Sequence, residues 1–341
     1  MRVLVTGHNG YIGSVMMPFL RSAGHDVVGL DSFYFEDCVL GQDVSTFPSL
    51  RKDLRDVTAH DLAGFDAICH LGGLSNDPLG DLKPDWTHDI NHRGSLHLAT
   101  LAKDAGVRRF LFSSSCSMYG ANSTDDLLTE DAPLNPLTPY AVSKVRLEQD
   151  LTKLGEDRFS PVFLRNATAY GVSPHLRADI VLNNLVAWAF TTGKVRIMSD
   201  GTPWRPIVHI EDICRAFAAM LDAPRELIHN QAYNIGLNSE NYQVRQLADL
   251  VKETVPGCEI EYAGKGGPDP RNYRVNFARL AKTFPDLKFQ WSARRGAQQL
   301  YAAFKQVGLK FEDLQGRKFI RLNQLKHLLS ADKLDDTLRW K

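Results

Sequence analysis

The sequence predicts an α/β protein built on a doubly wound parallel sheet, with a smaller mixed part toward the C-terminal end. Two observations lead to this fold class. Short apolar runs alternate with helical stretches over the first two-thirds of the chain, which indicates a parallel sheet with helices on both faces. A glycine-rich run also separates the first apolar run from the first helical stretch, where doubly wound folds turn sharply from strand to helix.

The elements expected in the first two-thirds follow from local patterns. Strands are expected at short apolar runs, which occupy residues 3–6, 26–30, 67–71, 109–113 and 162–165. A helix is expected at 11–23, directly after the glycine-rich run. A longer helix is expected at 86–105, because Ile90, Leu98 and Leu101 recur there at helical spacing.

The pattern loosens after residue 171. Four further helices are expected, at residues 180–191, 211–221, 243–254 and 294–307. Short strands are expected between them, at residues 195–198 and 232–235. The residues after about 311 are charged and only weakly periodic, and they are interpreted as an appended helical tail.

Composition excludes several classes of protein. The 341 residues suit about two domains, and 40 basic residues balance 40 acidic ones, which argues against a broad basic surface for nucleic acid or anionic lipid. The five cysteines form no CxxC pair, so neither a disulfide framework nor a zinc site is expected. A strand opens the chain and the apolar stretch 180–190 is too short for a bilayer. We therefore expect a cytoplasmic protein without nucleic-acid or membrane partners.

The glycine-rich run has the spacing GxxGxxG, a variant of the dinucleotide-binding fingerprint. Gly7 permits the tight turn, Gly10 lets the backbone approach a pyrophosphate, and Gly13 allows close packing of helix on strand. A strand precedes the run and a helix follows it, as the fingerprint requires. The alternative is a glycine-rich connection without a ligand. The expected cofactor contacts in this turn are Gly7, Asn9, Gly10, Tyr11, Ile12 and Gly13.

Asp31 ends the second predicted strand, where an acidic side chain can bond both ribose hydroxyls of a dinucleotide. A carboxylate at this place repels a 2′-phosphate, and no arginine lies among the next three residues, so NAD is favoured over NADP. The alternative is an aspartate that caps a helix or a turn.

Tyr140 and Lys144 lie four positions apart on a predicted helix and therefore share one face. An ordinary phenol has a pKa of about 10 and is a poor base at neutral pH. A neighbouring ammonium and a positive nicotinamide both stabilise a phenolate. Such a phenolate can take the proton of a sugar hydroxyl while hydride leaves the same carbon. The alternative is a solvated helix face.

These motifs together resemble the extended short-chain dehydrogenase/reductase family. The glycine-rich turn, the serine-rich segment 113–120, the PYxxSK run at 139–144 and the segment from Arg205 to Asp212 carry the resemblance. Within that family the chain is similar to the nucleotide-sugar epimerases and dehydratases of the UDP-glucose 4-epimerase type. The resemblance covers roughly residues 1–300 and implies a Rossmann fold; the tail is not explained by it.

The resemblance implies roles for individual residues. Ser115 would hydrogen-bond the reacting sugar oxygen, Tyr140 would be the acid/base, and Lys144 would support Tyr140 and hold the nicotinamide ribose. Asn91 would support this catalytic set. The remaining expected cofactor contacts are Asp53, Leu54, Leu71, Gly72, Gly73 and Ser113.

The resemblance also implies a substrate site for a nucleotide-diphosphate sugar. Asn183 and Asn184 resemble the segment that holds its diphosphate. Arg205 matches an arginine on that diphosphate, and Arg271 is a candidate second contact; a surface ion pair is the alternative for each arginine. The other expected substrate contacts are Ser115, Ser117 and Thr168.

Two departures from the family pattern narrow the reaction. Family 4,6-dehydratases carry Asp-Glu where this chain has Cys116 and Ser117, so elimination of water is not expected. Thr168 stands where related enzymes often have Asn, which indicates an unusual substrate pocket. A second acid/base role for Cys116 competes with that of a packed small residue. His88 and His92 lack a third ligand, so no metal site is expected.

The expected function is that of an NAD-dependent nucleotide-sugar epimerase acting at C4 through a transient 4-keto sugar. An NAD(P)H-dependent 4-keto-sugar reductase, or another enzyme of this family acting on a modified sugar, is one alternative; a silent NAD-binding sensor or scaffold is another. Residues 1–170 with about 205–235 would form the NAD-binding domain, and about 171–204 with 236–310 the substrate domain. About 311–341 would form the tail. The family commonly forms homodimers, so we expect one here.

Overall fold

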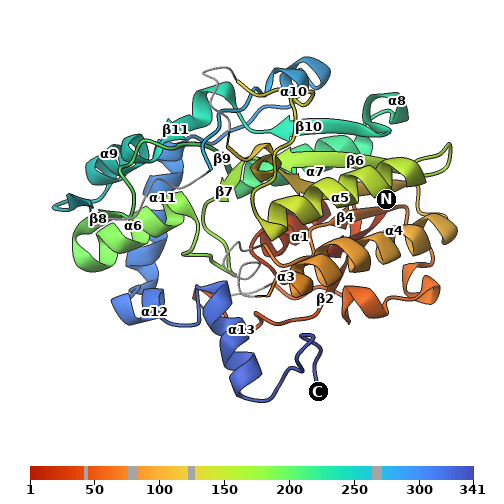
Figure 1. Ribbon diagram of the computed structural model, residues 1–341, viewed down its shortest axis with the longest axis horizontal. Helices are drawn as coiled ribbons and strands as arrows, with labels where there is room; N and C mark the ends of the chain where they lie inside the picture. Colours follow the sequence, from red (N-terminus) through yellow and green to blue (C-terminus); the bar gives the residue numbers. More distant parts are fainter. Residues whose placement is uncertain (42–44, 76–82, 122–126, 263–270) are drawn as a thin grey trace.

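A parallel sheet forms the centre of the protein (Figure 1), and the computed structural model describes residues 1–41, 45–75, 83–121, 127–262 and 271–341. Within those residues the sheet has seven strands in the order β10-β6-β5-β4-β1-β2-β3, and all neighbours are parallel. The strands are β1 Arg2–Thr6, β2 Asp26–Asp31, β3 Ser49–Arg51, β4 Ala67–His70, β5 Arg109–Ser115, β6 Ser160–Asn166 and β10 Gln231–Ile235. The chain direction across the sheet reverses between β1 and β4, which is where such sheets bind ligands.

Helices cover both faces of this sheet. Alternate residues of a strand point to opposite faces, so Val5 of β1 packs in one core and Leu4 in another. The first core lies under α1 (Gly13–Ser22) and α7 (Ile210–Asp222), and the second lies under α4 (Ser95–Asp104) and α5 (Pro139–Leu154). The doubly wound fold predicted from the alternating pattern is confirmed.

The helix expected at 86–105 is one helical stretch with an irregular middle. It begins as α3 (Pro84–Thr87), widens into a π-helical turn at His88–Gly94 and continues as α4. Such π-helical turns often lie at functional sites. This one carries Asn91, which is buried.

A second set of elements packs beside the sheet around its own core. It contains the three-stranded sheet β11-β9-β7 and the pair β12-β8. Its strands are β7 Thr168–Tyr170, β8 Lys194–Ile197, β9 Trp204–His209, β11 Asn241–Gln243 and β12 Glu259–Tyr262. Its longer helices, which bury Val186, Val251 and Phe304 together, are α6 Val181–Thr192, α9 Val244–Thr254 and α11 Ala293–Val307.

Short helices complete the described chain; they are α8 Arg225–Ile228, α10 Ala278–Thr283, α12 Phe311–Gln315 and the single turns Leu54–Asp56, Ala59–Leu62, Cys116–Tyr119 and Asn238–Glu240. The tail after α12 forms α13 (Arg321–Ser330) and then runs without a helix to Lys341. It lies beside β2 and α3 (Figure 1), where Leu325 and Leu338 share a small core with Tyr34 and Trp86. Of the helices in these residues, none has the length and apolarity needed to cross a membrane.

Candidate active site

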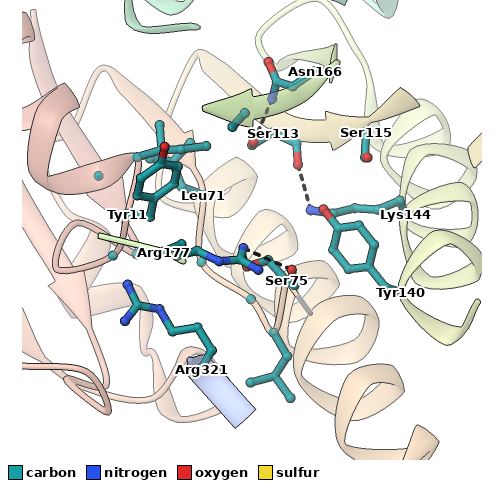
Figure 2. Close-up of a pocket in the computed structure, with 18 of the residues that line it drawn as sticks. Tyr11, Leu71, Ser75, Ser113, Ser115, Tyr140, Lys144, Asn166, Arg177 and Arg321 are labelled. Carbon is teal, nitrogen blue, oxygen red and sulfur yellow. Dashed lines mark hydrogen bonds between the residues drawn. The ribbon is translucent and has the colours of Figure 1, made fainter. Parts of the chain in front are cut away.

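A cavity of about 440 Å³ opens at the carboxyl ends of β1, β4, β5 and β6. Figure 2 shows its two sides: Tyr11 and Leu71 lie on one, and Tyr140 and Lys144 on the other. Most residues expected to bind ligands line it. Those that do are Gly7, Gly10, Tyr11, Ile12, Gly13, Asp31, Asp53, Leu54, Leu71, Gly72, Gly73, Ser113, Ser115, Ser117, Tyr140, Lys144, Thr168, Arg205 and Arg271. Asn9, Asn91, Asn183 and Asn184 are not among its lining residues.

Backbone contacts hold the glycine-rich turn and leave no room for a side chain at two of its three glycines. Gly7 has φ +71° and donates its N–H to Leu30 O at 2.8 Å, and a Cβ on it would lie 2.8 Å from Gly72 N. A Cβ on Gly13 would lie 2.6 Å from His8 Cα. On Gly10, by contrast, a Cβ would meet only Gly7 O closer than 3.4 Å. Gly7 and Gly13 are thus required by packing, whereas Gly10 leaves open space at the cavity wall.

Asp31 lies at the end of β2 and is fixed by two backbone donors. Its carboxylate accepts from Asn9 N–H at 3.0 Å and from Phe33 N–H at 2.8 Å. Burial raises the pKa of Asp31, and these two donors together with His8 oppose that rise. Asn9 therefore contributes its backbone to the position of Asp31.

Asp53 is bound by an arginine beside it in the sequence. Arg55 donates to the two oxygens of Asp53 at 2.9 Å and 2.7 Å, and it also reaches Asp89 at 2.8 Å. Burial opposes ionisation of Asp53, but the bonds from Arg55 hold the pKa of Asp53 below its usual range. Asp53 is thus a rigid anion on the same wall as Leu54.

The end of β4 is held in place by Asn91. Its side-chain oxygen accepts from Leu74 N–H at 2.7 Å, and its amide donates to Leu74 O at 2.9 Å. Gly73 lies against this amide, because a Cβ on Gly73 would be 3.0 Å from Asn91 Oδ1. Asn91 therefore acts through the cavity wall formed by Gly72, Gly73 and Leu74, and it does not line the cavity itself.

Lys144 and Tyr140 enter the cavity from the first turns of α5. The helix begins with Thr138, whose hydroxyl accepts from Ala141 N–H. Lys144 donates to Ser113 O at 2.7 Å, and its nitrogen lies 5.4 Å from the Tyr140 ring centre. Burial lowers the pKa of the Lys144 ammonium to about 7, and the charge of Glu148 opposes this. The structure thus places a titratable cation beside the Tyr140 phenol.

Ser115 at the end of β5 and Ser117 after it line the cavity, but Cys116 does not. Ser115 donates to the Ser117 hydroxyl at 2.8 Å, and both line the cavity. Cys116 between them has no exposed surface and donates to Arg165 O at 3.0 Å. Burial raises the pKa of the Cys116 thiol. Of the two interpretations of Cys116, the structure supports a packed small residue.

The expected substrate residues divide into two groups. Thr168, Arg205 and Arg271 line the cavity, and the Arg205 guanidinium donates to the Arg271 carbonyl. Asn183 has no exposed surface, because its amide donates to Arg177 O and to the Tyr11 hydroxyl and its oxygen accepts from Gly171 N–H.

Asn184 likewise donates to a carbonyl, Ala178 O, at 2.7 Å. Both side-chain amides thus donate to carbonyls of the segment before α6 and position the start of that helix; that Asn183 and Asn184 hold the substrate diphosphate stays a prediction.

Sequence reasoning missed several cavity residues, among them Tyr34, Ser75, Arg177, Asp179 and Arg321. Arg177 donates to the two oxygens of Asp179 at 2.9 Å and 3.0 Å and to the Ser75 hydroxyl at 2.9 Å. The RxD spacing of Arg177 and Asp179 after the YG of residues 170–171 was the available signal. Arg321 had none, because it lies in the tail.

The described residues fit a dinucleotide. Gly10 offers open space at the mouth of α1, and Asp31 is an acceptor beside it. The buried polar atoms without a hydrogen-bond partner in the described chain include Asn166 Oδ1 and Arg321 Nη1, which belong to residues that line the cavity. The glycine turn would hold the diphosphate, Asp31 the adenosine ribose, and Lys144 the nicotinamide ribose.

This fold and cavity define an extended short-chain dehydrogenase/reductase of the nucleotide-sugar branch. The chain belongs to the NAD dependent epimerase/dehydratase family, whose model matches residues 3–236. NAD is therefore its cofactor.

Individual relatives agree with this family but carry different reactions. The UDP-glucose 4-epimerase of Bacillus subtilis is 28% identical over 331 residues, which cover 89% of this chain and 95% of that protein. The UDP-glucose 4-epimerase structure from Thermotoga maritima superposes with a TM-score of 0.78 at 23% identity, covering 91% of this chain and 100% of the other. The NDP-hexosamine 5,6-dehydratase TunA superposes equally well, with a TM-score of 0.79 at 23% identity and coverage of 92% and 100%. The fold thus does not decide between epimerase and dehydratase.

Proposed function

We propose that this protein is an NAD-dependent nucleotide-sugar epimerase that inverts C4 through a transient 4-keto sugar, with Tyr140 as the acid/base. The observation that carries the proposal is that Tyr140, Lys144 and Ser115 face one cavity whose opposite side is the glycine turn. Arg205 and Arg271 line the same cavity and supply cations for the substrate's diphosphate.

In this proposal the chain's own residues orient the sugar and move one proton. Ser115 hydrogen-bonds the C4 oxygen, and Tyr140 takes the proton of that hydroxyl. Bound NAD supplies the hydride acceptor and later the donor, so no reductant is consumed overall. Lys144 stabilises the Tyr140 phenolate. After the 4-keto sugar has rotated to present its other face, Tyr140 returns the proton to the keto oxygen.

The acid groups of the cavity favour epimerisation over loss of water. Among its described lining residues the carboxylates are Asp31, Asp53 and Asp179. Asp31 and Asp53 belong to the adenosine side, and Asp179 is ion-paired with Arg177 at 2.9 Å. Eliminating water from a keto sugar needs a further acid beside the reacting carbons. Ser117 occupies the place where the dehydratases carry Glu, and a hydroxyl does not supply that acid.

We also propose a division of labour between the two parts of the chain. Residues 1–170 and about 205–235 would hold NAD, and about 171–204 and 236–310 would hold the sugar nucleotide. The place of β10 in the central sheet supports the first assignment, although β9 and β7 pair in the smaller sheet. A homodimer is proposed as well, and sedimentation of the purified protein tests it.

The experiment is incubation with UDP-, dTDP-, GDP- and CDP-sugars, followed by NMR of the products. UDP-sugars come first, because the curated relatives are named as UDP-glucose 4-epimerases. The proposal expects interconversion of C4 epimers by the wild type and loss of conversion in Tyr140→Phe. Tyr262→Phe is the matched control, since Tyr262 is 57% exposed on β12.

Three outcomes contradict the proposal. Net consumption of NADH or NADPH indicates the 4-keto-sugar reductase. Conversion of none of the sugars despite firm NAD binding indicates a silent binding protein. Full activity in Tyr140→Phe removes Tyr140 from the chemistry.

A further inference from the structure

One arginine of the cavity comes from the tail, outside the region that the family model matches. Arg321 is the first residue of α13, and the matched region ends at residue 236. Its side chain nevertheless lines the cavity together with Gly10 and Asp31. Figure 2 shows it on the same side as Tyr11 and Arg177, away from Tyr140 and Lys144.

The tail is anchored to the segment that follows β2. Gln324 donates to Tyr34 O at 3.0 Å, and Trp86 donates to Asp336 O at 2.7 Å. Leu325 and Leu328 of α13 pack with Tyr34 and Trp86 in the same small core. These contacts hold the N-terminal end of α13, and with it Arg321, in a defined place beside the cavity.

Arg321 is buried and forms no salt bridge within the described residues, although the charges of Asp179 and Asp31 act on it. It is 4% exposed, and its guanidinium lies 4.4 Å from the centre of the Phe35 ring. Its Nη2 donates to His175 O at 2.7 Å, whereas its Nη1 has no hydrogen-bond partner in the described chain. Burial lowers the pKa of Arg321 to about 10, and the charge of Arg177 adds to this. A buried guanidinium with an unused donor is costly unless an anion binds to it.

The neighbouring arginine is satisfied within the protein. Arg177 makes a two-pronged ion pair with Asp179 and bonds to Ser75. The charge of Arg177 is therefore balanced by the carboxylate of Asp179. In the part of the chain that the structure describes, Arg321 forms no salt bridge, and its guanidinium donates to the His175 carbonyl. Arg321 is the member of this pair that an incoming anion would engage.

We propose that Arg321 binds the diphosphate of NAD, so that the C-terminal tail completes the cofactor site. The surroundings of Arg321 favour the cofactor over the sugar nucleotide. Phe35 follows β2, and Asp31 is close enough that its charge and that of Arg321 each shift the other's pKa. The candidate arginines for the substrate's diphosphate, Arg205 and Arg271, are joined to each other by a separate hydrogen bond.

This inference depends on NAD binding and not on the proposed reaction. A protein that binds NAD through Arg321 but epimerises no sugar refutes the proposed function and leaves this inference intact. Full epimerase activity with unchanged NAD binding after loss of Arg321 refutes this inference and leaves the proposed function intact.

The test compares Arg321→Met, Arg321→Lys and the control Lys326→Gln in the full-length protein. Lys326 is an exposed cation on the same helix, so its loss removes one charge without touching the cavity. Calorimetric titration of cofactor-free protein measures the affinities for NAD, ADP-ribose, adenosine and UDP. Thermal unfolding of the same cofactor-free samples measures stability.

For Arg321→Met we expect about 10- to 100-fold weaker binding of NAD and ADP-ribose, the usual loss for a hydrogen bond to a charged group. Adenosine has no phosphate, and the diphosphate of UDP is that of the substrate and not of the cofactor. Both should therefore bind as they do to wild type. Thermal stability should not fall, because an unpaired buried charge is removed. Arg321→Lys should lie between wild type and Arg321→Met, and Lys326→Gln should match wild type.

Several results would overturn the inference. Unchanged NAD affinity in Arg321→Met shows that the guanidinium binds no phosphate. Equal losses for adenosine and NAD show a structural role at the adenosine side. A loss confined to UDP assigns Arg321 to the substrate. If Arg321→Met does not fold, wild-type NAD affinity in a folded Arg321→Lys has the same meaning as unchanged affinity.

Discussion

Replacing Gly13 by alanine should destabilise the protein, whereas the same change at Gly10 should mainly weaken NAD binding. A Cβ on Gly13 would meet Gly7 O and lie 2.6 Å and 2.8 Å from His8 Cα and C. These are backbone atoms, and Gly7 is held by its bond to Leu30 O and by the Gly72 backbone. Overpacking of this kind costs about 1–3 kcal/mol, and the rigid surroundings favour the upper end.

At Gly10 the first contact of a Cβ is Gly7 O at 3.0 Å and the next lies at 4.0 Å. This one tight contact strains the folded protein, whereas alanine restricts the unfolded chain and stabilises by about 0.4–1 kcal/mol, so the net loss of stability should be smaller than at Gly13. The methyl group would occupy the space where the backbone approaches the diphosphate. We expect the affinity for NAD to fall about tenfold or more, which is about 1.4 kcal/mol.

Urea unfolding followed by far-UV circular dichroism measures the first effect in both variants, and calorimetric titration with NAD measures the second in Gly10→Ala. A wild-type urea midpoint for Gly13→Ala refutes the packing argument. Wild-type NAD affinity in Gly10→Ala shows that the turn does not cradle the diphosphate.

Three other predictions concern the interior around α5. Burial lowers the pKa of Lys144 to about 7, so between about pH 7 and pH 10 the unfolded chain binds one more proton than the folded chain, and stability rises with pH. The free energy of unfolding of wild type, relative to that of Lys144→Met, should rise by up to about 1.4 kcal/mol per pH unit in this range and stay constant below it. Urea unfolding at several pH values measures this difference, and a difference that does not change with pH contradicts the prediction. Glu148→Gln should cost about 3–5 kcal/mol in unfolding free energy, because the buried Arg165, now 2.7 Å from Glu148, loses its counter-ion. A loss of less than about 1 kcal/mol in the free energy of unfolding contradicts the idea that the Arg165–Glu148 ion pair is shielded from water. Cys116→Ala should keep the kcat of wild type for any sugar nucleotide that reacts, since the thiol faces Arg165 O; a loss above about tenfold (~1.4 kcal/mol in the activation barrier) restores Cys116 as an acid/base.

The fold and the cofactor turn were predictable because their signals are local. Alternation of short apolar runs with helical stretches follows from the two side-chain periodicities, and it yields the parallel sheet directly. Gly7, Gly10 and Gly13 mark a strand–turn–helix unit and lie close together in the sequence. The Tyr140–Lys144 spacing likewise needs only one helix.

The parts that escaped prediction depend on contacts between distant segments. Asn183 is predicted as a substrate contact, and its pairing with Tyr11, 172 positions away, could not be foreseen because it has no local pattern. Arg321 reaches the cavity because α13 packs on Tyr34, 290 positions from its partner Gln324. The irregular middle of the helix at His88–Gly94 left no mark on the regular apolar spacing from which the helix was predicted.

The most direct test of the proposed function uses a nucleotide sugar carrying deuterium at C4. The sugar is the one that the wild type converts in the panel, incubated with catalytic amounts of NAD-loaded protein and followed by NMR. Epimerisation at C4 predicts the inverted product with deuterium retained at C4, no net formation of NADH, and no conversion by Tyr140→Phe. Loss of the label to solvent, product without inversion, or consumption of one reductant per turnover contradicts it.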